Sequence, residues 1–153
     1  MNLFMLKAIQ EARYGIERKE GGPFGSAIVK DGKIIGSGHN QVLLLKNPTC
    51  HGEMQAIRNA CAALDTHDLS GCVLYTTGEP CPMCLAACLW ANIEKVYYGC
   101  TIADNAEIGF RDEKFYNLMS ADRAELGNYL ECIDRDACVE LFKEYKKSNP
   151  PRY

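Results

Sequence analysis

Two short motifs constrain the folding of this chain more than any other feature. Residues 51–53 read His-Gly-Glu and residues 80–84 read Pro-Cys-Pro-Met-Cys, and each opens a segment with helical periodicity. Cys81 and Cys84 are three residues apart, so at the start of a helix both sulfurs can point to one side. The partial positive charge of a helix N-terminus also favours thiolate over thiol. We therefore expect a fold that brings the starts of these two helices together.

The residue types in the two motifs indicate a catalytic metal site. His51, Cys81 and Cys84 offer zinc one imidazole and two thiolates, which leaves the fourth position open for water. Glu53 stands close enough to exchange protons with that water without binding the metal. The alternative from another class is a structural zinc or binding module without catalysis. Glu53 argues against it, because a structural site has no use for a carboxylate beside an open position.

The cysteine content indicates the compartment. Nine cysteines, an odd count with irregular spacing, do not suggest a secreted disulfide framework. Residues 1–13 lack a continuous hydrophobic segment, so we expect neither export nor membrane insertion, and a cytoplasmic location. The cysteines outside the zinc motif are expected to be small core residues, with Cys50 notable because it adjoins His51. They are Cys50, Cys61, Cys72, Cys88, Cys100, Cys132 and Cys138.

Size and charge limit the partners. A chain of 153 residues without repeats or linkers fits a single domain spanning residues 1–153. The net charge of −3 argues against binding of a nucleic-acid backbone as the main activity. The basic residues near the end of the chain are diluted by glutamates, and we interpret them as the solvated face of a last helix. They are Lys143, Lys146, Lys147 and Arg152.

Hydrophobic periodicity predicts the order αββαβαβαβα, and from it an α/β fold. Helices are expected over residues 3–18, 51–64, 83–91, 111–119 (a short helix or a turn) and 134–147, and strands over 24–30, 33–39, 73–77, 95–100 and 129–133. Residues 83–91 are apolar on nearly all sides, which is typical of a helix buried in the interior. This order predicts a three-layer α/β/α sandwich around a mixed five-stranded sheet.

The motif order His-x-Glu followed by Pro-Cys-x-x-Cys is that of zinc nucleobase deaminases. The chain resembles the cytidine deaminase-like superfamily over nearly its whole length, and within it the bacterial guanine deaminases. Besides the zinc motifs, the similarity lies in residues 22–25 (Gly-Pro-Phe-Gly), 38–40 (Gly-His-Asn), 47–49 (Asn-Pro-Thr), 89–91 (Leu-Trp-Ala) and 109–112 (Gly-Phe-Arg-Asp). This resemblance implies one Zn²⁺ per chain held by His51, Cys81 and Cys84, with Glu53 as the proton carrier.

The resemblance also implies how a base is bound. Asn40 pairs with the base through its amide, and Asp112 accepts hydrogen bonds from the amino group or the leaving ammonia. Phe24, Trp90 and Phe110 form aromatic walls around the planar heterocycle. By sequence alone, Asn40 could equally be a turn residue, Asp112 a helix cap or a solvated charge, and the aromatics core residues.

The implied reaction is hydrolytic deamination of guanine at C2, giving xanthine and ammonia. The alternatives are a cytosine deaminase, a guanosine or purine-analogue deaminase, and a tRNA adenosine deaminase. Cytosine remains an alternative substrate because of Gly52, which stands where most guanine deaminases have alanine. The His-Gly-Glu form, with Gly-His-Asn upstream, also resembles the fungal cytosine deaminases. The tRNA alternative is weakened by a sequence pI near 5.6 and the lack of a basic tail.

The resemblance further implies a homodimer in which the C-terminal segment is exchanged. The last helix places Cys138, Leu141, Phe142 and Tyr145 at a spacing suited to a buried face. Prolines 150 and 151 would stiffen the tail so that it reaches beyond its own domain. Tyr153 would then help to close the site of the partner subunit. The alternative is a frayed terminus.

Overall fold

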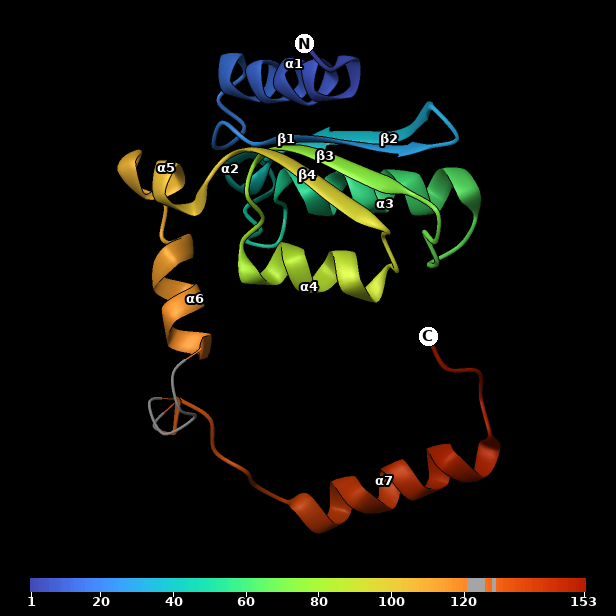
Figure 1. Ribbon diagram of the computed structural model, residues 1–153. Helices are drawn as coiled ribbons and strands as arrows, with labels where there is room; N and C mark the ends of the chain where they lie inside the picture. The colour runs from blue at the N-terminus through green and yellow to red at the C-terminus, as the bar shows by residue number, and fades with distance from the viewer. Residues whose placement is uncertain (121–125, 128) are drawn as a thin grey trace. The chain divides into compact units, whose positions relative to one another are not determined.

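The computed structural model describes residues 1–120, 126–127 and 129–153, which form two compact units, Met1–Tyr116 and Asn117–Tyr153. The elements in chain order are α1 (Leu3–Glu17), β1 (Gly25–Lys30), β2 (Lys33–His39), α2 (Val42–Leu45), α3 (Gly52–Leu64), β3 (Val73–Gly78), α4 (Pro82–Trp90), β4 (Lys95–Cys100), α5 (Ile102–Glu107), α6 (Asp112–Ser120) and α7 (Arg135–Ser148). In the first unit, α1 covers one face of the sheet while α3 and α4 cover the other (Figure 1). The expected three-layer α/β/α sandwich is therefore confirmed.

The sheet is mixed, with strand order β2-β1-β3-β4. Strand β1 is antiparallel to both β2 and β3, whereas β3 and β4 run parallel, as expected for strands joined by a crossover helix. The described residues form a sheet of four strands, so the prediction of a fifth strand at residues 129–133 is wrong. Tyr129 and Ile133 are exposed and irregular. Strand propensity in five residues cannot form a strand without a neighbouring edge to pair with.

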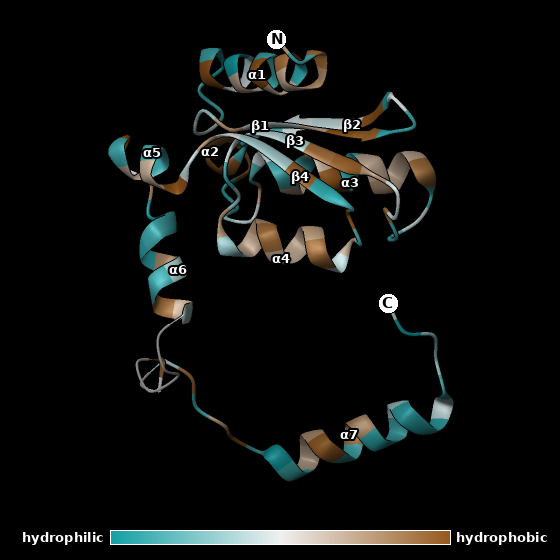
Figure 2. Cartoon of the chain, viewed as in Figure 1, coloured by the Kyte–Doolittle hydropathy of each residue, from teal (hydrophilic) through white to brown (hydrophobic). Residues whose placement is uncertain are grey.

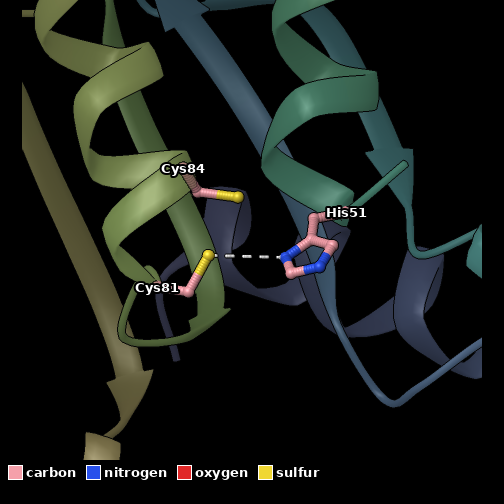
Figure 3. Close-up of side chains that lie close together, drawn as sticks. All are labelled: His51, Cys81 and Cys84. Atoms are coloured by element: carbon pink, nitrogen blue, oxygen red, sulfur yellow. Dashed lines mark hydrogen bonds between the residues drawn. The ribbon is translucent and has the colours of Figure 1, made fainter. Parts of the chain in front are cut away.

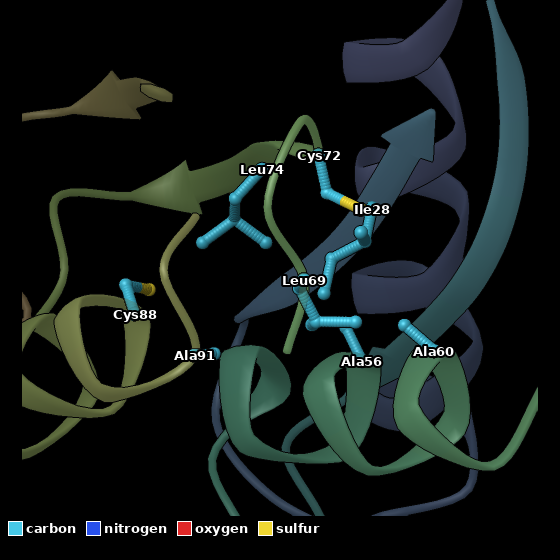
Figure 4. Packing of buried hydrophobic residues seen from close by; sticks show 8 residues of the cluster. All are labelled: Ile28, Ala56, Ala60, Leu69, Cys72, Leu74, Cys88 and Ala91. Carbon is cyan, nitrogen blue, oxygen red and sulfur yellow. The ribbon is translucent and has the colours of Figure 1, made fainter. Parts of the chain in front are cut away.

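The core lies between the sheet and the two helices α3 and α4 (Figure 4). Its fully buried members are mostly small: Ile28, Ala56, Ala60, Leu69, Cys72, Leu74, Cys88 and Ala91. Small residues let the helices approach the strands closely. At Gly36 on β2, a Cβ atom would lie 2.6 Å from the backbone nitrogen of Ala60 on α3. This close packing fixes the position of α3 against the sheet, and so the position of His51 at its N-terminus.

Helix α4 is only half buried, so the prediction of an interior helix is wrong. Cys84 and Cys88 face the core, but Leu89 is 69% exposed and Trp90 is 65% exposed. Most of the length of α4 has apolar colouring in Figure 2. A helix that is apolar all round is buried on every side only when a second layer covers it, and periodicity cannot report whether one is present.

The cysteines divide in the same way. Cys50, Cys72 and Cys88 are buried as expected, and Cys61 is half buried. The expectation of a core position is wrong for Cys100, Cys132 and Cys138, which are exposed. Cys100 ends the edge strand β4, and the other two lie in the second unit, whose helix α7 has no buried residue.

The second unit confirms a last helix, α7, but its apolar side chains are uncovered. Leu141, Phe142 and Tyr145 are exposed, with Phe142 at 71%. No helix in the described part of the chain is long and apolar enough to cross a membrane.

Candidate active site

The two zinc motifs open helices α3 and α4, as their spacing predicts. His51 is the N-cap residue of α3 and Cys81 is the N-cap residue of α4, both with extended backbone. Pro82 occupies the first position of α4, where a missing N–H costs no hydrogen bond and the fixed φ favours a helix. Because α3 and α4 pack side by side under the sheet, their N-termini meet at one point (Figure 1).

His51, Cys81 and Cys84 converge at this point (Figure 3). Their ligand atoms, His51 Nδ1 and the two Sγ atoms, all lie within 4.8 Å of one another, and Cys81 Sγ is 3.6 Å from Nδ1. A tetrahedral zinc ion with bonds of about 2.0–2.3 Å needs its ligand atoms roughly 3.5–3.8 Å apart, so the donor set and its spacing fit this metal.

The electrostatics of the cluster also suit a cation. Hydrogen bonds with Cys84 and His51 lower the pKa of the Cys81 thiol to about 4, although burial acts against them. The same hydrogen bond with Cys81, together with burial, raises the pKa of Cys84. The hydrogen bond with Cys81 likewise raises the pKa of His51. Protons are thus shared among His51, Cys81 and Cys84. A metal ion that bound to these three side chains would displace the protons.

Glu53 is the second residue of α3 and is 5% exposed. Burial raises the pKa of its carboxyl to about 7, and the charge of Cys81 acts in the same direction. A cation bound to His51, Cys81 and Cys84 would act in the opposite direction. A carboxyl group with a pKa near neutrality can both accept and donate a proton, which is what a proton carrier needs.

A cavity of about 430 Å³ opens in front of the cluster, within the range of small-molecule sites. Seven of the ten sequence-predicted site residues line it: Phe24, Asn40, His51, Glu53, Cys81, Phe110 and Asp112. Phe24 and Phe110 meet edge to face, with ring centroids 4.7 Å apart. This arrangement is favourable for aromatic pairs and forms an apolar wall.

Hydrogen bonds to other residues fix the positions of Asn40 and Asp112, two polar residues of the cavity. The backbone nitrogen of Asn40 donates to Phe24 O at 2.8 Å, and its Oδ1 accepts from Val42 N at 3.1 Å. Asp112 Oδ2 accepts from Asn105 Nδ2 at 3.3 Å. Burial raises the pKa of Asp112, and the charge of Cys81 adds to the effect.

Comparison with known proteins identifies the family. A family model described as the cytidine and deoxycytidylate deaminase zinc-binding region matches residues 1–100. The chain belongs to this deaminase family. It is therefore a hydrolase that acts on a C–N bond.

Individual relatives of the deaminase carry different activities, among them those of guanine deaminase and of tRNA-specific adenosine deaminase. A guanine deaminase of Bacillus subtilis is 47% identical over 74% of this chain and 72% of its own. A solved structure of guanine deaminase from the same organism has a TM-score of 0.92 at 38% identity, over 100% of this chain and 99% of that one. A tRNA-specific adenosine deaminase of Aquifex aeolicus is 48% identical over 62% of each chain. A solved structure bound to 2,6-diaminopurine has a TM-score of 0.68 at 34% identity, over 71% and 61% of the two chains.

Two predicted site residues of the first unit, Cys84 and Trp90, do not line the cavity of the deaminase. Cys84 lies behind Cys81 in the ligand cluster. Trp90 ends α4, at the opposite end of the helix from Cys81, and is exposed, so the structure does not place it as a wall of the pocket in its own chain. Tyr153 belongs to the second unit, where it is 82% exposed.

Several residues in or near the cavity have no role predicted from the sequence. Glu79 and Arg111 line it, and Glu79 Oε2 accepts a hydrogen bond from Ile102 N at 2.9 Å. Tyr116 donates its hydroxyl to Pro80 O at 2.6 Å, just before the ligand Cys81. Arg111 stands inside the motif of residues 109–112 and Glu79 directly precedes that of residues 80–84, which was a usable signal. Tyr116 stands in no recognisable motif.

Proposed function

We propose that this deaminase converts the free base guanine to xanthine and ammonia. The observation that carries the proposal is the extent of the match. The Bacillus guanine deaminase structure aligns over the whole chain, including the segment with Phe110 and Asp112, whereas a solved structure from work on tRNA:A34 deaminases covers 65% of it. The bound 2,6-diaminopurine of another neighbour supports a purine as the small-molecule substrate.

One zinc ion per chain, held by His51, Cys81 and Cys84, would supply a Lewis acid that makes water acidic. In the proposed reaction Glu53 takes the proton of the water that attacks C2 of guanine. It passes this proton to a ring nitrogen, then takes the second proton from the hydroxyl group now on C2 and gives it to the amino group. The bond from C2 to the amino nitrogen breaks, ammonia leaves and xanthine remains.

The other cavity residues would hold the base. Phe24 and Phe110 exclude water from the faces and edges of the heterocycle. The Asn40 amide offers a donor and an acceptor to the base. The Asp112 carboxylate accepts hydrogen bonds from the exocyclic amino group and from the departing ammonia. Its position at the start of α6, in the same cavity as Glu53, supports this role.

We further propose that both units belong to one deaminase domain, which works as a homodimer in the cytoplasm with exchanged C-terminal segments. The exposed apolar side chains of α7, among them Phe142, and those of α4 support an interface between copies. Tyr153 would complete the cavity of the partner subunit, over which a prolyl tail could extend. Nine free cysteines suit a reducing compartment.

An ultraviolet assay of the purified protein tests the substrate. Guanine, guanosine, cytosine, cytidine and adenine are offered separately, and we expect guanine to have the highest kcat/KM. Asp112→Ala should lower kcat/KM for guanine by about 10- to 100-fold, the loss of one hydrogen bond to a charged group, with zinc content unchanged. A wild-type preference for cytosine would contradict the proposal and favour the fungal-type alternative.

A further inference from the structure

Outside the cavity, a buried charged network joins α1, the turn after it and the end of β2. His39 is 8% exposed, and its ring lies between two carboxylates. Its Nδ1 is 3.1 Å from Glu11 Oε2, and its Nε2 is 2.6 Å from Glu20 Oε2. An ionised carboxylate only accepts hydrogen bonds, so a ring nitrogen that carries a proton donates to the carboxylate it faces. Such charge-assisted hydrogen bonds are about twice as strong as neutral ones.

Both carboxylates are held in the ionised form. Burial raises the pKa of Glu11, but hydrogen bonds from Lys7 and His39 outweigh it, and the net pKa lies below its usual value. Hydrogen bonds from His39 and Gln41 lower the pKa of Glu20 to about 2. Both carboxylates are therefore charged throughout the neutral range.

Glu20 also forms hydrogen bonds with residues 40–44, which we call the wall of the cavity. Its Oε2 also accepts from Gln41 Nε2 at 2.9 Å. Its backbone oxygen accepts from Leu43 N at 3.0 Å and from Leu44 N at 3.1 Å. Glu20 thus binds the start of the wall through its side chain and the end of the wall through its backbone oxygen.

The wall carries Asn40, directly after His39. The Asn40 amide takes its orientation from this wall, because its Oδ1 accepts from the backbone nitrogen of Val42 at 3.1 Å. We propose that Glu20 and His39 are positioning residues that hold the wall, and through it the Asn40 amide, in the geometry that binds the base. Neither residue lines the cavity, so they act through Asn40. The inference rests on the proposed role of Asn40.

Steady-state kinetics of Glu20→Gln tests the inference. The substitution keeps the shape of the side chain and removes the charge that strengthens its hydrogen bonds. We expect KM to rise about tenfold while kcat and zinc content stay close to wild type, because the wall contributes binding shared by substrate and transition state. Glu17→Gln is the matched control, since it makes the same chemical change on the exposed side of α1 and should leave KM unchanged.

A double-mutant cycle with Asn40→Ala separates positioning from a merely structural role. If Glu20 acts through Asn40, Glu20→Gln should have no further effect on kcat/KM in the Asn40→Ala background, whereas independent losses add. Additive losses, or an unchanged KM in Glu20→Gln, would overturn the inference. If Glu20→Gln fails to fold, His39→Gln takes its place with the same expectations.

The double-mutant cycle does not depend on which base is the substrate. It is measured on whichever base of the ultraviolet panel the wild type deaminates fastest. A wild type that prefers cytosine refutes the proposed substrate, while the coupling between Glu20 and Asn40 still supports or overturns the positioning role.

Discussion

At the scale of single residues, Glu53 is the proposed proton carrier. Glu53→Gln should keep the fold and the zinc, because the amide fills the same buried space without a charge. It cannot take a proton from water, so kcat should fall by about 10²–10⁴-fold. Glu113→Gln, on the exposed surface of α6, is the control and should turn over like wild type. Turnover near wild type in Glu53→Gln would mean that another group carries the proton.

Glu20 gives the molecule a measurable dependence of stability on pH. The pKa of its carboxyl falls from 4.5 to about 2 on folding, chiefly through the hydrogen bond with His39. A lowered folded-state pKa stabilises the fold at pH above the unfolded value, and this stabilisation is lost as the pH falls towards 2. Wild type should therefore exceed Glu20→Gln in free energy of unfolding at pH 6, by a margin that shrinks towards pH 3. Urea unfolding measures both, and a margin that is constant over this range would contradict the assignment.

At the scale of elements, the close approach of α3 to β2 depends on a missing side chain. In Gly36→Ala the new methyl group would lie 2.6 Å from Ala60 N and 2.7 Å from Ala56 O, both backbone atoms that cannot rotate away. Helix α3 must shift, and overpacking of this kind costs about 1–3 kcal/mol. Urea unfolding should show this loss, with Lys33→Ala at the exposed start of β2 as control. An unchanged midpoint in Gly36→Ala would show that the helix adapts freely.

Periodicity predicted the elements that are long enough to have a period. Helices α1, α3, α4 and α7 and all four strands were predicted within a few residues of their observed bounds. Helices α2 and α5 were not predicted, because they span only 4 and 6 residues. Helix α5 begins with a capping box between Thr101 and Asp104, a local signal that was present in the sequence.

The site was predictable to the extent that its residues stand in local motifs. His51, Cys81 and Cys84 follow from spacing, since both ends of the ligand set begin helices. The network of Glu11, Glu20 and His39 was not predictable, because strand register and a turn bring together residues that are 28 and 19 positions apart. No one-dimensional pattern reports such a contact between elements.

At the scale of the whole molecule, the exposed apolar surfaces remain to be explained. Both α4 and α7 carry large apolar side chains that are uncovered in the single chain, including Leu89 and Leu141. Sequence patterns predicted that these faces would be buried, without indicating what would cover them. In the proposed homodimer, a second copy of the chain would be the cover for these faces.

Deleting residues 149–153 tests this arrangement. The deletion removes Tyr153 and the two prolines but leaves His51, Cys81 and Cys84 intact, so zinc content should stay at one ion per chain. If the tail closes the cavity of the partner subunit, kcat/KM for guanine should fall at least tenfold, a loss of about 1.4 kcal/mol of transition-state binding. Tyr153→Ala is the matched variant that keeps the tail and should lose activity in the same direction. Light scattering should show a dimer for the wild type. A monomer, or an unchanged rate after the deletion, would remove the exchanged C-terminus and leave the zinc chemistry untouched.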